Sequence, residues 1–247
     1  MYESLAGVYD FFAYDFDYDA WTKRYLDLLK AQKDDIKELC DVGCGTGEIA
    51  IRLIRSGLRV TGVDLSEDML NVASDKARRA GVQLPLVRQD MRCLRLPHKT
   101  DAILCACDGV NYLTKLSGAE EFFASAFACL KPGGALAFDV SNTAKLSKMG
   151  RDGVYFEDTA DRTYLWQNSF DEETRVLRMD IRFFLRGEDG KYTKTSETHV
   201  QRAHSAEEIT ALLKKTGYEN ITVCGSDTET GEGPGGQRIY FSARKPK

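Results

Sequence analysis

A short segment rich in glycine and flanked by carboxylates carries the residues that could do chemistry. The sequence LCDVGCGTGEIA places Gly43, Gly45 and Gly47 between two apolar runs, with Asp41 before the turn and Glu48 after it. Glycines that follow a strand let the backbone pass close to a ligand, and many such turns hold phosphate groups. Here the two carboxylates would repel a phosphate. The turn therefore predicts a nucleoside-like ligand with a neutral or positive group beside the glycines.

The turn can be compared with two known phosphate-binding motifs. A dinucleotide turn has the spacing G-x-G-x-x-G, whereas the third glycine here comes one residue early and Glu48 follows it. A P-loop requires G-K-[ST], which the segment lacks. S-adenosylmethionine fits better, because it has no phosphate and carries an ammonium and a sulfonium group. An NAD-dependent oxidoreductase remains an alternative.

Carboxylates after the next two expected strands complete a nucleoside site. Asp64 ends the apolar run VTGVD, where its carboxylate can accept hydrogen bonds from ribose hydroxyls. Asp90 and Met91 follow the third expected strand, where they can meet the adenine amino group and the face of its ring.

These residues need a scaffold, and the sequence predicts one in which strands alternate with helices. The expected strands cover residues 36–43, 58–65, 84–90, 101–108 and 135–140, and the expected helices cover 48–57, the stretch between Ser66 and Gly81, and 117–130. Ser117 and Glu120 have the spacing of a capping box. Regular alternation of this kind predicts an α/β fold with a doubly wound parallel sheet.

The alternation breaks between residues 150 and 203, where no helical period is found. Apolar residues at alternate positions over 177–185 predict a one-sided antiparallel strand, 187–192 a hairpin turn, and 192–202 and 163–170 two further strands. A helix with a capping box (Ser205, Glu208) then covers 205–218, before two last strands at 219–225 and 237–245. We expect a helical cap (1–35), a core (36–149), a β insertion that acts as a lid (150–203) and a return to the core (204–247).

Composition excludes several classes of function. The formal net charge of −4 and the pI near 5.6 give no electrostatic signature of nucleic-acid binding. No apolar run approaches the ~20 residues of a membrane span, and the N-terminus has no signal-peptide pattern. The seven cysteines are odd in number and lie mostly in apolar runs, which favours reduced thiols in the cytoplasm. No histidine stands near a cysteine, so we expect no metal site.

Four segments, ELCDVGCGTG, GVDLSEDML, VRQDM and KPGGALAFDV, resemble the successive signatures of class I S-adenosylmethionine-dependent methyltransferases, over about residues 36–142. The segments YESLAGVYD, DYDAW, CDGVNYL, FDVSN and ETHVQR further resemble a group of bacterial small-molecule methyltransferases with a β insertion, over nearly the whole chain. The resemblance implies a Rossmann-like seven-stranded sheet whose last strand is antiparallel.

The same resemblance implies which residues contact S-adenosylmethionine. They are Tyr9, Asp41, Gly43, Gly45, Asp64, Leu65, Met69, Asp90, Met91 and Cys107. For Met69 a purely structural role, as a buried helix residue, explains the sequence equally well.

The end of the fourth strand points to a small-molecule acceptor. Methyl transfer needs an aligned nucleophile and the exclusion of water, and a general base only where the acceptor carries a proton. The segment ACDGVNYL resembles neither the [DN]-P-P-[YFW] of amino-methylating nucleic-acid enzymes nor the Pro-Cys of cytosine C5 enzymes. A non-catalytic protein that binds S-adenosylmethionine or serves as a partner module is the alternative.

Candidate acceptor residues come from the fourth and fifth strand ends and from the insertion. They are Asn111, Tyr112, Asn142, Trp166, His199 and Arg202. The catalytic candidates are His199, Tyr112 and Asp108, with His199 as a base or orienting group. Arg202 would contact an acidic group of the acceptor. The alternative for His199 and Arg202 is a solvated strand face, and the alternative for Trp166 is core packing.

Overall fold

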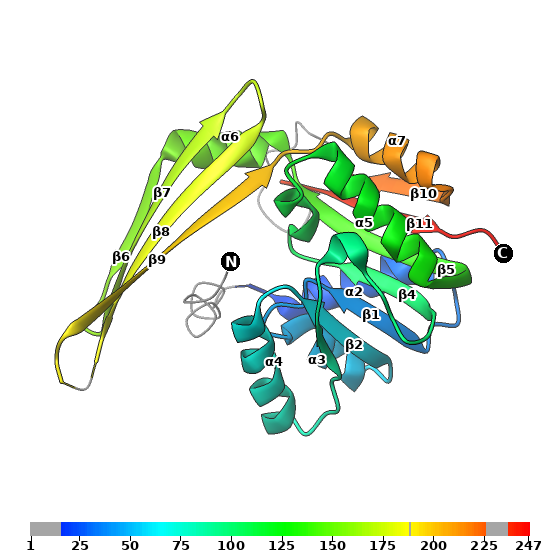
Figure 1. The fold of residues 1–247 in the computed structure, drawn as a ribbon, viewed down its shortest axis with the longest axis horizontal. Helices are drawn as coiled ribbons and strands as arrows, with labels where there is room; N and C mark the ends of the chain where they lie inside the picture. The colour runs from blue at the N-terminus through cyan, green and yellow to red at the C-terminus, as the bar shows by residue number, and fades with distance from the viewer. Residues whose placement is uncertain (1–15, 188, 226–236) are drawn as a thin grey trace.

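The computed structural model describes residues 16–225, except residue 188, and residues 237–247. Two separate sheets organise this part of the chain (Figure 1). The larger sheet has seven strands in the order β10-β11-β5-β4-β1-β2-β3, and the smaller has four in the order β6-β7-β8-β9.

The larger sheet has the predicted doubly wound topology. Its strands are β1 (Glu38–Val42), β2 (Arg59–Asp64), β3 (Leu86–Arg88), β4 (Thr100–Cys105), β5 (Leu130–Ser141), β10 (Glu219–Cys224) and β11 (Arg238–Arg244). Strands β1 to β5 pair in parallel, whereas β11 runs antiparallel to both β5 and β10. The fold class and the antiparallel last strand are confirmed. Because the carboxyl ends of β1, β2, β3 and β4 meet at one edge, the turns that follow them lie close together.

Helices cover both faces of this sheet and form two cores. On one face α2 (Tyr18–Lys30) and α3 (Glu48–Arg55) pack Tyr25 and Leu53 against the strands. On the other face α5 (Leu116–Cys129) and α7 (Ala206–Thr216) pack Phe122 and Leu213 against the strands. The remaining helix of the core, α4 (Glu67–Arg79), contacts β2 and β3. Burial on both faces explains why residues 102–105 of β4 and 135–138 of β5 are continuous apolar runs.

The predicted start of α5 is wrong by one residue, and its capping box does not form. Lys115 precedes the helix and its carbonyl accepts hydrogen bonds from the backbone of Gly118 and Ala119, so Ser117 already lies inside the first turn. Glu120 instead forms an ion pair of 2.6 Å with Lys215 of α7. The capping box predicted at Ser205 and Glu208 is present.

The smaller sheet lies between β5 and α7 in the chain and extends away from the core (Figure 1). It consists of β6 (Val154–Asp158), β7 (Arg162–Asp171), β8 (Val176–Arg186) and β9 (Tyr192–Arg202), all antiparallel. The three predicted strands are confirmed, but β6 and helix α6 (Thr143–Asp152) were not predicted. Strand β6 is exposed at almost every position, so it lacks the alternation that identifies a half-buried strand.

One face of the smaller sheet, called here the inner face, is covered at one end by α6. It carries Phe170, Asn168, Trp166 and Tyr164 from β7, Leu177, Met179, Ile181 and Phe183 from β8, and Gln201, His199 and Glu197 from β9. Leu146 and Met149 of α6 pack against the apolar members of this set. Most of the inner face is therefore an apolar core, into which β9 places polar side chains.

Gly150 lets α6 lie directly on β7, and this close approach yields a test of the packing. A Cβ atom at Gly150 would lie 2.2 Å from Cβ of Phe170 and 2.8 Å from its backbone nitrogen. We expect Gly150→Ala to lower the free energy of unfolding by about 1–3 kcal/mol, the usual cost of overpacking, in chemical denaturation. Lys148→Ala, at an exposed position of the same helix, is the matched control. A stabilised Gly150→Ala variant, as helix propensity alone would give, contradicts this packing.

Candidate functional site

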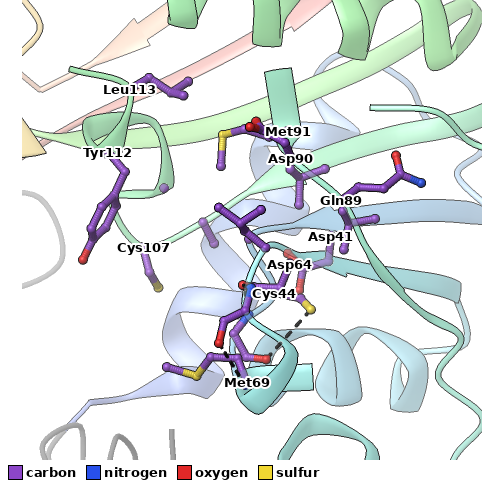
Figure 2. A pocket seen from close by; sticks show the side chains of 18 of the residues that line it. Asp41, Cys44, Asp64, Met69, Gln89, Asp90, Met91, Cys107, Tyr112 and Leu113 are labelled. Carbon is purple, nitrogen blue, oxygen red and sulfur yellow. Dashed lines mark hydrogen bonds between the residues drawn. The ribbon is translucent and has the colours of Figure 1, made fainter. Parts of the chain in front are cut away.

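A cavity of about 630 Å³ opens where the carboxyl ends of β1, β2, β3 and β4 meet. Figure 2 shows its lining side chains converging from the turns after these strands. The volume is that of a site for a molecule the size of a nucleoside derivative. Nine of the ten predicted cofactor residues line it: Asp41, Gly43, Gly45, Asp64, Leu65, Met69, Asp90, Met91 and Cys107. The tenth, Tyr9, lies outside the described residues.

The glycine turn forms the floor of the cavity. Gly43, Gly45 and Gly47 all have positive φ, at 72°, 54° and 82°, a conformation that other residues rarely adopt. Gly47 precedes α3, and a Cβ atom there would lie 3.1 Å from Cβ of Ala73 in α4. The turn therefore needs glycine for its backbone conformation and, at Gly47, for the close packing of two helices.

Asp64 holds the turn to the next strand. Its Oδ2 accepts a hydrogen bond of 2.9 Å from the backbone N–H of Gly45, and its Oδ1 accepts one of 2.9 Å from that of Ser66. Burial raises the pKa of Asp64, and the hydrogen bonds from Ser66 and Gly45 partly offset that rise. The carboxylate lines the cavity at the end of β2, the position expected of a ribose contact.

Asp41 contributes a buried oxygen without a partner. The residue is 1% exposed, and its Oδ2 has no hydrogen-bond partner among the described residues. Burial, and then the neighbouring charge of Asp64, raise the pKa of Asp41 to about 7. An unsatisfied buried acceptor is costly, and a cationic donor in the cavity would satisfy it. The ammonium and sulfonium groups of S-adenosylmethionine fit this site.

Glu48 keeps the helix N-terminus beside the turn acidic. Its carboxylate lines the cavity and accepts a hydrogen bond of 2.7 Å from Lys76 and another from Arg52. Burial alone would raise the pKa of Glu48, but the hydrogen bonds from Lys76 and Arg52 lower it. A pyrophosphate at the start of α3 would meet this carboxylate, so the site is unsuited to a dinucleotide.

Asp90, which also lines the cavity, is already engaged by Arg92. It caps the short helix η1 (Met91–Cys93) by accepting from the backbone of Arg92, and Arg92 Nη2 donates to its Oδ2 at 2.5 Å. The hydrogen bonds from Arg92 lower the pKa of Asp90. Contact of Asp90 with an adenine amino group therefore requires the carboxylate to be shared with Arg92.

The turn after β4 is held by a buried charge network that the sequence did not reveal. Cys107 and Asp108 both have positive φ, at 57° and 67°. Tyr25 Oη accepts from the backbone of Cys107 at 3.2 Å and donates to Asp139 at 2.5 Å. Arg238 of β11 forms ion pairs with both Asp108 and Asp139. These partners come from α2, β5 and β11, too far apart in the chain for any motif to join them.

This network makes Asp108 and Cys107 unreactive as a base and as a nucleophile. Asp108 does not line the cavity, and it is also paired with Lys145. Burial would raise the pKa of Asp108, but the charges of Arg238 and Lys145 lower it to about 2, so the carboxylate is a poor base. Cys107 does line the cavity, but burial and then the charge of Asp139 raise the pKa of its thiol, which disfavours a nucleophilic thiolate.

Two predicted acceptor residues have structural roles instead. Asn111, in the short helix η2 (Gly109–Tyr112), donates through Nδ2 to the carbonyls of Ser141 and Arg202, at 3.1 and 2.9 Å. Asn142 caps α6 by accepting from the backbone of Lys145 at 2.8 Å. Both side chains are fully buried, and neither lines the cavity.

Two predicted residues of the insertion, Trp166 and Arg202, also make structural contacts. Trp166 packs against the apolar core of the inner face. Arg202 binds Glu208 at 2.8 Å and donates to His204 Nδ1 at 2.7 Å, while His204 Nε2 contacts the carbonyl of Leu113 at 2.9 Å. Arg202 and His204 thus join β9 to α7 and to the end of η2. Burial, and then Arg202, lower the pKa of His204 to about 4.

Tyr112 and His199 connect the inner face to the cavity. Tyr112 lines the cavity, and its Oη lies 3.5 Å from Nδ1 of His199, with the two rings edge to face. His199 Nε2 lies 3.0 Å from Oε2 of Glu197. The alternative of a solvated strand face is wrong for His199, because its side chain is 2% exposed and that of Glu197 is 8% exposed.

Among the described residues, no group of three or more His, Cys, Asp or Glu side chains could hold a metal ion. Within the same part of the chain, no helix is long and apolar enough to cross a membrane.

Comparisons with known proteins agree on one kind of relative. A family described as "Methyltransferase domain" matches residues 39–134. The chain is 34% identical over 248 aligned residues to "Putative methyltransferase YqeM" of Bacillus subtilis (strain 168), covering 100% of this chain and 98% of that protein. It is 32% identical over 142 residues to the dTDP-3-amino-3,4,6-trideoxy-alpha-D-glucopyranose N,N-dimethyltransferase of Streptomyces venezuelae, covering 56% of this chain and 58% of the other.

A solved structure gives the same result over the full length. The crystal structure of an S-adenosylmethionine-dependent methyltransferase from Clostridium acetobutylicum ATCC 824 superposes with a TM-score of 0.82. The two chains are 28% identical, and the match covers 98% of each.

The buried carboxyl of Asp41 makes the stability of the cofactor-free protein depend on pH. Its pKa rises from 3.8 to about 7 on folding, so its contribution is fully present below about pH 4 and is lost as the pH rises through 7. In urea denaturation, we expect the unfolding free energy of Asp41→Asn to rise relative to that of wild type over this window, by up to about 1.4 kcal/mol for each pH unit. Asp34→Asn, at an exposed carboxylate, is the control. Parallel stability curves for Asp41→Asn and wild type would refute the assignment.

Proposed function

We propose, from the premise that this chain belongs to the S-adenosylmethionine-dependent methyltransferases, that it methylates a small-molecule acceptor held between the cavity and the inner face. The single observation that carries the proposal is the cavity itself. It gathers the predicted cofactor residues and opens beside Tyr112, which contacts the inner face through His199.

Within the cavity we assign parts of the cofactor to particular residues. Asp64 binds the ribose hydroxyls, and Met91 with Leu65 covers the adenine. The unpartnered oxygen of Asp41 receives the ammonium group of the methionine part, beside Gly43 and Gly45. Bound S-adenosylmethionine supplies an electrophilic methyl group on a sulfonium. The residues of the chain orient the cofactor and acceptor, and exclude water from between them.

Three features support a small acceptor over a nucleic acid. The cavity is lined by five carboxylates (Asp41, Glu48, Asp64, Asp90, Glu121) against two basic residues (Arg92, Lys115), which disfavours a phosphate backbone. The smaller sheet meets Tyr112, which lines the cavity, through His199, and we propose that it acts as a lid. The relative from Streptomyces venezuelae is named for a sugar substrate.

The free cysteines among the described residues suit a cytoplasmic location.

The acceptor can be found with S-adenosylmethionine carrying a labelled methyl group. We expect the purified protein, incubated with a protein-free metabolite extract, to move the label into a small molecule that mass spectrometry identifies by its added methyl. Heat-denatured protein is the control. If the protein binds S-adenosylmethionine in calorimetry but labels nothing in extracts or nucleic acid, the non-catalytic alternative holds.

The ribose assignment has its own test. We expect Asp64→Ala to weaken the binding of S-adenosylhomocysteine by about 1–3 kcal/mol, the scale of lost buried hydrogen bonds, in isothermal titration calorimetry. Asp75→Ala, which removes an exposed carboxylate of α4 that is paired with Arg78, serves as the matched control. An unchanged dissociation constant for Asp64→Ala would mean that the ribose binds elsewhere.

A further inference from the structure

The inner face contains an acid–base pair that its packing does not explain. Its β8 strand presents Leu177, Met179, Ile181 and Phe183, all nearly fully buried. Directly opposite Ile181 and Met179, β9 places Glu197 and His199, whose side chains are 8% and 2% exposed. Replacing a buried polar pair by apolar residues commonly leaves stability unchanged or raises it. Packing would therefore be served as well by two apolar residues, and the pair calls for another role.

The pair is oriented toward the cavity. Glu197 Oε2 contacts His199 Nε2 at 3.0 Å, and a neutral imidazole in this contact carries its proton on Nε2 and presents Nδ1 as a hydrogen-bond acceptor. On the other side of the ring, Nδ1 lies 3.5 Å from Tyr112 Oη. This distance is at the long limit for a hydrogen bond, and such contacts commonly tighten when substrate binds. The order carboxylate, imidazole, hydroxyl is that of a catalytic triad, in which the imidazole takes the hydroxyl proton and the carboxylate orients and stabilises the ring.

Only the hydroxyl end of this series reaches the reaction. Tyr112 lines the same cavity as the glycine turn and Cys107, and Figure 2 shows its ring reaching down beside Cys107. His199 and Glu197 do not line the cavity. The charged groups of the neighbouring strand do not interfere, because Arg178, Asp180 and Arg182 of β8 project from the opposite face.

We propose that Tyr112, His199 and Glu197 form a proton relay that accepts a proton from the acceptor's nucleophilic nitrogen or oxygen. The inference rests on the proposed function and specifies the acceptor class: a molecule whose nucleophile still carries a proton that must leave. Tyr112 is the catalytic residue, and His199 and Glu197 are positioning residues that act through it.

The step balances in atoms and charge. The acceptor's proton passes to Tyr112 Oη as the hydroxyl proton of Tyr112 moves to His199 Nδ1. The acceptor's lone pair forms the new bond to the methyl carbon, while the carbon–sulfur bond breaks and its electron pair stays on sulfur. The imidazolium is stabilised by the carboxylate of Glu197 until product release, when the proton returns to water.

The test compares Tyr112→Phe, His199→Asn and Glu197→Gln with wild type in the labelled-methyl assay on the protein-free extract. We expect the first two to lower the rate at neutral pH by about 10²–10⁴-fold, the usual contribution of general base catalysis. The dissociation constant for S-adenosylhomocysteine should change little. Gln201→Leu, on the same face of β9 opposite Leu177, is the matched control and should retain its rate.

A second readout separates a relay from a structural role. As the pH is raised, the solvent removes the acceptor's proton, so the rate of His199→Asn should recover toward that of wild type. Lost packing would give no such recovery. In wild type, ¹⁵N spectra of the three histidines should show His199 protonated at Nε2 and unprotonated at Nδ1.

Each contrary outcome is distinct. An active wild type whose Tyr112→Phe and His199→Asn variants keep its rate, or whose His199 carries its proton on Nδ1, overturns the relay and leaves the methyltransferase assignment standing. A rate of His199→Asn that stays low at every pH overturns it as well. A wild type that labels nothing overturns the proposed function, and the relay with it.

Discussion

The buried network around Arg238 is the interaction on which the site depends. One guanidinium from β11 forms ion pairs with both Asp108 and Asp139, and Asp139 in turn accepts a hydrogen bond from Tyr25 of α2. Three distant parts of the chain are thereby tied to the turn that follows β4, whose Cys107 and Asp108 have a backbone conformation unfavourable for residues other than glycine. Removing one partner would leave an uncompensated buried charge, so the network stands or falls as a unit.

Much of the larger sheet was predictable because its signals are local. Apolar runs of strand length, Ser66 and Ser205 as helix caps, and Asp64 at a strand end are each visible within a few residues. The smaller sheet was less accessible. Helix α6 is short and its cap, Asn142, is equally typical of a loop, while β6 lacks a buried face. Helix α6 is stabilised by packing against β7 and β8, and β6 by pairing with β7, and no local period records either contact.

The candidate site likewise has one part that local sequence signals predict and another that depends on long-range contacts. Its cofactor half is made of turns that directly follow strands, so a strand prediction also places the side chains. Its acceptor half depends on how β9 lies relative to η2, and that is decided by long-range contacts such as His204 with Leu113. His199 is a candidate from the sequence alone, but only the fold shows that its side of β9 is buried and meets Tyr112.

Asn111 joins the two ends of the segment that carries the smaller sheet. A single amide nitrogen binds the carbonyl of Ser141, where the chain leaves the core, and that of Arg202, where it returns. The two ends of the intervening segment thus meet at one side chain. The turns that line the cavity and the sheet proposed as a lid are therefore separate parts of the chain, joined where Asn111 contacts Ser141 and Arg202.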